Sequence, residues 1–244
     1  MEEPLACLPR TRESELEGYR VMGVDEAGRG PLAGPVVVAA AVVPHSIPGI
    51  TDSKLLAKEE DRERLYEQLV ASPNIQWAVA VIDAARIDEI NILQATMEGM
   101  RLAAHAVMAP QNDSEEASVE RQGCYVVCGP EAASQKKPKF YALIDGNRLP
   151  KDMSCEAETI IKGDSKEYCI AAASILAKVT RDRLMREYDK MYPHFKLSQH
   201  KGYPTAVHMA LVKEHGASPI HRRSFAPLKH MTFDKDGRVV TDDS

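Results

Sequence analysis

The sequence predicts an α/β fold: a mixed sheet flanked by helices, followed by a small helical C-terminal subdomain. Three strand-like segments lead the chain, and helices and strands then alternate, which is typical of this class. Apolar residues make up 44% of the 244 residues, which is enough for the core of one sizeable domain. No stretch approaches the roughly 18 consecutive apolar residues of a membrane-spanning helix, so we expect no membrane partner.

The leading strands are predicted from runs of valine and from alternating apolar residues. Arg20–Glu26 and Pro35–Val43 are two such runs, joined by a connection full of glycine and proline, and Ile75–Ile82 is the third. Between them, Glu59–Val70 has the composition of a helix, with two leucines one turn apart.

The middle of the chain contains two helical patterns followed by a long polar segment. Asp83 is predicted to cap a short helix, and Asn91–Met108 is predicted to be an amphipathic helix because its apolar residues recur on one face. Residues 110–139 are polar and lack a sustained period, so we expect a loosely ordered surface insertion. Within it, CYVVC at 124–128 has the pattern of a short, locally paired strand.

The second half of the chain alternates regularly. Phe140–Asp145 and Glu158–Lys162 are predicted strands, and Tyr168–Met191 is a predicted long helix with an apolar start and a charged end. A last helix is predicted over Thr205–His215, capped by its first residue and ended by Gly216.

These elements divide the chain into four parts: an N-terminal extension (1–18), a main α/β domain that carries the insertion (19–198), a helical segment (199–230) and a flexible tail (231–244). The first 20 residues contain five glutamates, which argues against a secretory or transit peptide. The five cysteines are odd in number and irregularly spaced, as expected of reduced thiols. We therefore expect a soluble, intracellular protein.

Charge is distributed unevenly along the chain. The net charge is −5, yet residues 178–229 contain eleven Lys and Arg against four Asp and Glu. Such a basic stretch forms either a phosphate-binding face or an ordinary solvated, salt-bridged helix surface, and charge alone leaves both interpretations open.

Four acidic residues lie at the ends of predicted strands, where sheet proteins commonly have their catalytic or binding side chains. Asp25 and Glu26 end the first strand, Asp145 ends the fourth, and Asp164 follows the fifth. If they converge, their mutual repulsion raises the pKa of at least one, and divalent cations with oxygen ligands relieve it. Two such ions can activate a water and stabilise the leaving oxygen of a phosphodiester. Locally, each acid also fits a plain turn or strand end.

Eight segments of the sequence resemble, in order, the motifs of the ribonuclease HII (type 2 ribonuclease H) family. They span nearly the whole chain outside 110–139 and the two termini. They are GVDEAGRGPLAGPVVVAA (23–40), TDSKLL (51–56), DEINILQATM (88–97), LIDGN (143–147), KGDSK (162–166), AASILAKVTRD (172–182), QHKGYPT (199–205) and EHGASPIHRRSFAP (214–227). The chain is most similar to the single-chain, bacterial kind, which implies a ribonuclease H-like mixed sheet and, at 199–230, a substrate-binding segment.

The resemblance implies that Asp25, Glu26, Asp145 and Asp164 are the catalytic, metal-binding carboxylates. The implied cofactor is Mg²⁺, with Mn²⁺ as a substitute, as a pair of ions bridged by Asp25. No histidine is needed as a general base, because the metal activates the water.

The resemblance also implies substrate contacts. Gly28, Arg29 and Gly30 are similar to the loop that reads a 2′-hydroxyl with main-chain groups, and glycines permit the close approach that this requires. Tyr203 resembles the tyrosine that stacks on the nucleotide beside an RNA–DNA junction.

Four basic residues are further candidates for the phosphate backbone: Lys54 and Lys178, and with less support Arg222 and Arg223. Two features depart from the family pattern. The 110–139 segment is longer than the usual connection, and Ala57 stands where the family commonly has a capping serine.

The implied function is an endoribonuclease that hydrolyses the RNA strand of RNA–DNA hybrids. It also cuts 5′ of single ribonucleotides in a DNA duplex, leaving a 3′-hydroxyl and a 5′-phosphate. We expect a monomer. Two alternatives remain: a nucleic-acid-binding subunit without catalysis, and a nuclease of the same fold that acts on DNA. A dinucleotide-binding module is disfavoured because the glycines at 28, 30 and 34 have the wrong spacing and precede a strand.

Overall fold

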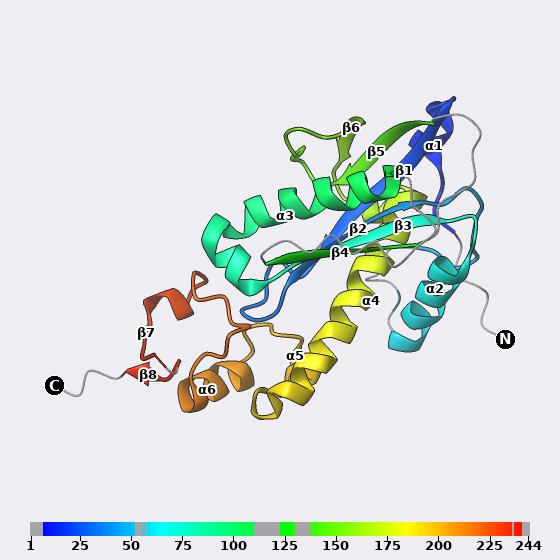
Figure 1. The fold of residues 1–244 in the computed structure, drawn as a ribbon. Helices are drawn as coiled ribbons and strands as arrows, with labels where there is room; N and C mark the ends of the chain where they lie inside the picture. The colour runs from blue at the N-terminus through cyan, green and yellow to red at the C-terminus, as the bar shows by residue number, and fades with distance from the viewer. Residues whose placement is uncertain are drawn as a thin grey trace.

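The computed structural model describes residues 7–51, 56, 58–109, 123–129, 138–235 and 237–240. Its centre is a six-stranded sheet in the order β4-β3-β2-β1-β5-β6 (Figure 1). Strands β1 to β4 pair antiparallel, whereas β1, β5 and β6 run parallel. The strands are β1 (Tyr19–Ala27), β2 (Val36–Val42), β3 (Gln76–Ile82), β4 (Cys124–Cys128), β5 (Lys139–Asp145) and β6 (Glu156–Ile160).

Helices cover both faces of this sheet, α3 on one and α2 with α4 on the other (Figure 1). The helices are α1 (Thr11–Glu15), α2 (Glu59–Ala71), α3 (Ala84–Met108), α4 (Tyr168–Met191), α5 (Leu197–His200) and α6 (Ala206–His215). Short 3₁₀ turns occupy Gly163–Ser165, Pro193–Phe195 and Leu228–His230. None of the described helices is both long enough and apolar enough to cross a bilayer.

Strand β2 shows why this architecture forms. Its sequence VVVAAAV is buried at every position, as expected of a strand covered on both faces. Val38 and Ala40 pack with α3, whereas Val37 and Ala39 pack with α4. On β1, a Cβ at Gly23 would lie 2.1 Å from the Cys169 carbonyl carbon, so only glycine lets α4 pack this closely. That contact brings the start of α4 against the middle of β1.

Most sequence-predicted elements are confirmed, with small shifts. The helix at 168–191 has the predicted bounds, and β6 begins and ends two residues before the predicted strand. Asp83 caps α3 by accepting from the Arg86 N–H at 2.7 Å. The two predicted helices form one element kinked at Asn91, where φ is 68° and the side chain accepts from the Gln94 N–H.

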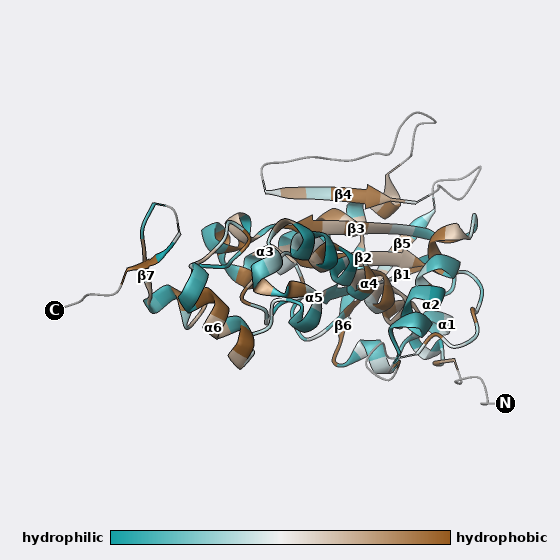
Figure 2. Cartoon of the chain, turned by 90° about the horizontal axis from the view of Figure 1, so that it is seen from below, coloured by the Kyte–Doolittle hydropathy of each residue, from teal (hydrophilic) through white to brown (hydrophobic). Residues whose placement is uncertain are grey.

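The segment 110–139 is not wholly a surface insertion. Residues 124–128 form β4, which pairs with β3 in the central sheet rather than locally. Val126 of β4 packs in the core on the α3 side of the sheet, and most of β4 is hydrophobic in Figure 2. Residues 110–122 and 130–137 lie outside the described residues, as does Ala57.

The C-terminal segment forms a lobe beyond the end of the sheet, drawn in orange and red in Figure 1. Its core includes Phe195, Leu197, Val212 and Leu228, which pack with Leu32 from the loop after β1. Two short stretches of the predicted flexible tail form strands instead. Thr232–Phe233 (β7) and Val239–Val240 (β8) pair antiparallel, because Gly237 (φ 83°) permits a tight turn and Phe233 packs on the lobe.

Candidate active site

Four carboxylates line one pocket of about 450 Å³ at the edge of the sheet where β1, β5 and β6 end. Asp25 and Glu26 belong to the end of β1, Asp145 ends β5, and Asp164 lies in the 3₁₀ turn after β6. The three strands are parallel neighbours, so their carboxyl ends meet at the same edge. Residues up to 139 positions apart in the sequence are thereby brought together.

The turn after β6 holds two of these acids in place. Lys162 takes a left-handed conformation (φ 56°), which reverses the chain directly after the strand. The Gly163 N–H then donates to Asp145 Oδ1 at 2.6 Å, and Asp164 is buried next to it. This turn therefore orients the Asp145 carboxylate and places Asp164 in the lining of the pocket.

Burial and mutual repulsion make this pocket costly for negative charge. Asp25 is 4% exposed, and burial raises its pKa well above 3.8, with Glu26 and Asp145 adding to the rise. Burial also raises the pKa of Glu26, which Asp145 and Asp164 raise further, although Arg29 at 3.4 Å lowers it. The pocket therefore favours a bound cation.

The donors fit a hard divalent cation, because all four are carboxylate oxygens. In the described part of the chain, no three His, Cys, Asp or Glu side chains are already gathered as a metal-binding group. The acids surround the pocket without closing on a common point, yet they interact electrostatically across it.

Two buried arginines hold the glycine-rich loop beside the acids. Arg222 is fully buried and donates to the carbonyls of Gly28, Arg29, Pro31 and Gly34, at 2.6 to 3.1 Å. A fully buried side chain does not contact phosphate, so the sequence-based candidacy of Arg222 is wrong. Arg223 is exposed, and its main-chain N–H donates to Asp88.

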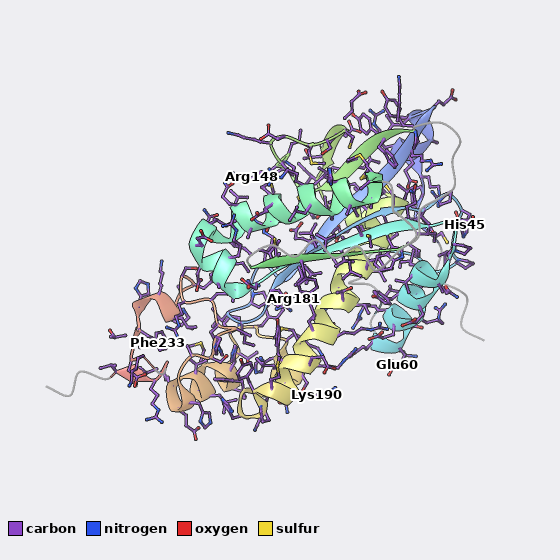
Figure 3. All side chains as sticks on the ribbon, in the orientation of Figure 1. His45, Glu60, Arg148, Arg181, Lys190 and Phe233 are labelled. Carbon is purple, nitrogen blue, oxygen red and sulfur yellow. The ribbon has the colours of Figure 1, made fainter. Side chains whose placement is uncertain are left out.

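Arg181 of α4 supports the same loop from the other side. It is buried and donates to the carbonyls of Pro35, Ala33 and Lys201, and it lies between the sheet and the C-terminal lobe (Figure 3). A Cβ on Gly28, where φ is 94°, would lie 2.0 Å from Arg181 Nε. Gly28 is thus required both for its backbone conformation and for this approach.

Tyr203 stands at the rim of the pocket, 47% exposed. A Cβ on Gly30 would lie 3.6 Å from Tyr203 Cε1, so the ring neighbours the glycine-rich loop. Lys178 also lines the pocket, with Nζ 2.7 Å from Asp182 of the same helix. Lys54 lies outside the described residues.

Sequence reasoning did not single out five residues that line this pocket: Ala27, Leu56, Arg62, Ser174 and Arg181. Ser174 lies on α4 and its hydroxyl hydrogen-bonds to Asp25, which lowers the pKa of that carboxyl. A usable signal existed: Ser174 is the one polar residue in the run AAASILA and lies one turn before Lys178. None of the histidines among the described residues lines the pocket.

Comparison with known proteins gives consistent relatives. A family model described as "Ribonuclease HII" matches residues 22–228. Proteins named ribonuclease HII from Xanthomonas axonopodis pv. citri (strain 306) and Xylella fastidiosa (strain M12) are 46% and 47% identical to this chain over 220 and 218 residues. These alignments cover 89% and 88% of this chain, and 78% and 80% of those proteins.

Solved structures share the fold. The ribonuclease H2 from Pyrococcus horikoshii OT3 superposes with a TM-score of 0.59 at 25% identity, covering 86% of this chain and 95% of that one. Bst-RNase HIII in complex with Mn²⁺ gives a TM-score of 0.55 at 18% identity, covering 88% and 70%. The predicted ribonuclease H-like fold is confirmed, and with a family match across most of its length this chain belongs to the ribonuclease HII family of endoribonucleases.

Proposed function

We propose that this enzyme hydrolyses the RNA strand of RNA–DNA hybrids and cuts 5′ of single ribonucleotides embedded in duplex DNA. The products carry a 3′-hydroxyl and a 5′-phosphate. The observation that carries the proposal is the gathering of four carboxylates beside a glycine-rich loop and an exposed tyrosine, all in one pocket. We further propose that it acts as an intracellular monomer.

Asp25, Glu26, Asp145 and Asp164 would hold the divalent cations, Mg²⁺ or in its place Mn²⁺, with Asp25 between two ions. Such ions activate a water and stabilise the leaving oxygen of a phosphodiester. The raised pKa values of Asp25 and Glu26 support this assignment, because uncompensated buried carboxylates resist ionisation. A distant structural neighbour, Bst-RNase HIII, was solved with Mn²⁺.

The loop of Gly28, Arg29 and Gly30 would recognise the 2′-hydroxyl that separates RNA from DNA. Arg222 occupies the carbonyls of Gly28 and Arg29, so the loop offers main-chain N–H groups to a ligand. The missing side chain at Gly30, where a Cβ would meet only Tyr203 Cε1 at 3.6 Å, lets a sugar approach the backbone. Discrimination between ribose and deoxyribose then depends on the loop keeping its main-chain conformation.

Tyr203 would stack against the nucleotide beside the RNA–DNA junction, where its half-exposed ring borders the pocket. Lys178 and Lys54 would contact phosphates and so position the strand without reading its sequence. Lys178 remains partly exposed although it pairs with Asp182, so it can exchange this partner for a phosphate.

A cleavage assay separates this proposal from its alternatives. A labelled DNA duplex with one ribonucleotide is incubated with the enzyme, with Mg²⁺ and with a chelator, and the termini are identified. We expect a single cut 5′ of the ribonucleotide that requires the metal. Binding without cleavage would indicate a non-catalytic subunit, and cutting of an all-DNA duplex would indicate a DNA nuclease.

A further inference from the structure

Two buried histidines form a hydrogen-bonded pair in the C-terminal lobe. His208 of α6 and His221 are 0% and 2% exposed, and their Nε2 atoms lie 3.0 Å apart. Neither lines the pocket of the four acids. A buried polar pair is stable only when each nitrogen finds a suitable partner. The partners at the two ends of the pair therefore determine what it does.

Backbone atoms determine which nitrogen carries each proton. His208 Nδ1 lies 3.0 Å from the Tyr203 carbonyl oxygen, which can only accept, so Nδ1 donates. His208 Nε2 is then the acceptor, and His221 Nε2 donates to it. His221 Nδ1 accepts from the N–H of Ser218 at 3.1 Å. The chain of donors thus runs from Ser218 through both rings to Tyr203.

This pattern requires both rings to be neutral. Burial lowers the pKa of His208 to about 4 and, aided by His208, that of His221 to about 3. A proton added to His208 would set two N–H groups against each other at Nε2, and a proton added to His221 would set its Nδ1 against the Ser218 N–H. The pair is therefore intact at neutral pH.

A third histidine holds the other side of the same turn. The ring of His200 stacks on that of His208 with centroids 4.4 Å apart. Its Nε2 donates to the Phe195 carbonyl, and its main-chain oxygen accepts from the Tyr203 N–H at 2.9 Å. The Tyr203 carbonyl accepts from the Thr205 N–H as well as from His208. Both main-chain groups of Tyr203 are thus held by this cluster.

We propose that His208 is a positioning residue for Tyr203: the hydrogen bond from its Nδ1, relayed from Ser218 through His221, sets where the tyrosine ring stands at the pocket rim. This inference rests on the proposed role of Tyr203 at the RNA–DNA junction. Lys201 and Gly202, which precede Tyr203, have φ values of 51° and 82°, so the turn has little regular structure of its own. An added donor to the Tyr203 carbonyl limits the movement of this turn.

A matched pair of substitutions tests this role. His208→Asn keeps an amide near the Nδ1 position, whereas His208→Gln keeps one near Nε2 and loses the bond to Tyr203. The readout is the ratio of cleavage rates on a single-ribonucleotide duplex and on a long RNA–DNA hybrid. This ratio does not depend on how much of each preparation is folded. His105→Gln, at an exposed histidine of α3, is the control.

We expect His208→Gln to lower this ratio about five- to tenfold, the effect of losing one buried hydrogen bond. His208→Asn and the control should stay near the wild-type ratio. In a Tyr203→Ala background His208→Gln should have no further effect, because both changes act through the same ring. If His208→Gln fails to fold, His208→Leu, which has the shape of asparagine without its polar groups, replaces it in the same comparison.

Three results would overturn the proposal. One is a wild-type ratio for His208→Gln while Tyr203→Ala lowers it. Another is an equal loss in His208→Asn and His208→Gln, which would indicate packing rather than the hydrogen bond. The third is an undiminished effect of His208→Gln in the Tyr203→Ala background. If Tyr203→Ala itself leaves the ratio unchanged, the junction role proposed for Tyr203 is wrong, and the positioning role falls with it.

Discussion

Arg222 donates from Nη2 to the Gly28 carbonyl oxygen at 2.6 Å, across 194 positions of sequence. This bond ties the C-terminal lobe to the loop that follows the acids of β1. The guanidinium has a planar fork of donors, so one side chain serves four carbonyls of the loop. The lobe and the glycine-rich loop therefore depend on each other for their structure.

Arg222→Lys should destabilise the protein although it preserves the charge. Lysine cannot reach four carbonyls at once, and each buried group left without a partner costs about 1–3 kcal/mol. We expect a loss of about 3 kcal/mol or more in the free energy of unfolding, measured by urea denaturation. Arg223→Lys, at the exposed neighbour, should change it by less than about 0.5 kcal/mol. Equal effects would contradict the loop-holding role.

Asp25→Asn should stabilise the metal-free protein near neutral pH. In the unfolded chain Asp25 has a pKa near 3.8, and in the folded protein burial and neighbouring acids raise it. Between these two values the folded protein binds more protons than the unfolded chain, so the contribution of Asp25 to stability falls as the pH rises.

The substitution removes this ionisation. In thermal melts with a chelator we expect Asp25→Asn to raise the Tm near pH 7, and the gain to shrink as the pH is lowered towards 4. The matched control is Asp152→Asn, at an exposed aspartate. A Tm gain that is independent of pH would argue against strain from the buried charge.

Val126→Asp should test whether residues 124–128 belong to the folded sheet. Val126 is 2% exposed in β4, whereas its neighbour Val127 is 36% exposed. Burying an unpaired carboxylate is costly, so we expect Val126→Asp to lower the free energy of unfolding by about 3 kcal/mol or more, and Val127→Asp by far less. Similar losses would mean that β4 is not anchored in the core. A deletion of residues 112–137 would remove β4 and is therefore not expected to be harmless.

Tyr203→Ala should impair cleavage at a single ribonucleotide more than cleavage of a long hybrid. Stacking on an aromatic ring contributes about 1–3 kcal/mol per base, so the rate at the single ribonucleotide should fall about tenfold or more. Tyr203→Phe keeps the ring and should retain most of the rate. Steady-state cleavage of both substrates measures this, and equal losses on both would exclude a junction-specific role.

The sequence was sufficient to predict most of the elements, because their patterns are local. The helix at 168–191 and the caps at Asp83 and Thr205 follow from periodicity and from side chains that bond within three residues. The four acids could be singled out because each stands at the end of a strand pattern. Their convergence could not be derived locally, since it depends on the order of parallel strands in the sheet.

What sequence reasoning missed depends on distant partners. Arg222 and Arg181 look like ordinary basic residues of a charged segment, and only the folded chain shows that main-chain carbonyls surround them. The strand at 124–128 was predicted with local pairing, and its true partner was missed because β3 lies more than 40 residues earlier and the flanks of the strand are polar. The contact between the two buried histidines was likewise missed, since the sequence gives no sign of their pairing.

The central claim is that the four carboxylates hold the catalytic metal, and Asp145→Asn tests it most directly. The substitution preserves shape and the oxygen that accepts from Gly163, so the protein should keep its wild-type Tm. Cleavage of a DNA duplex with one ribonucleotide, measured with Mg²⁺, should fall to background. Near-normal cleavage by a folded Asp145→Asn protein would contradict the account.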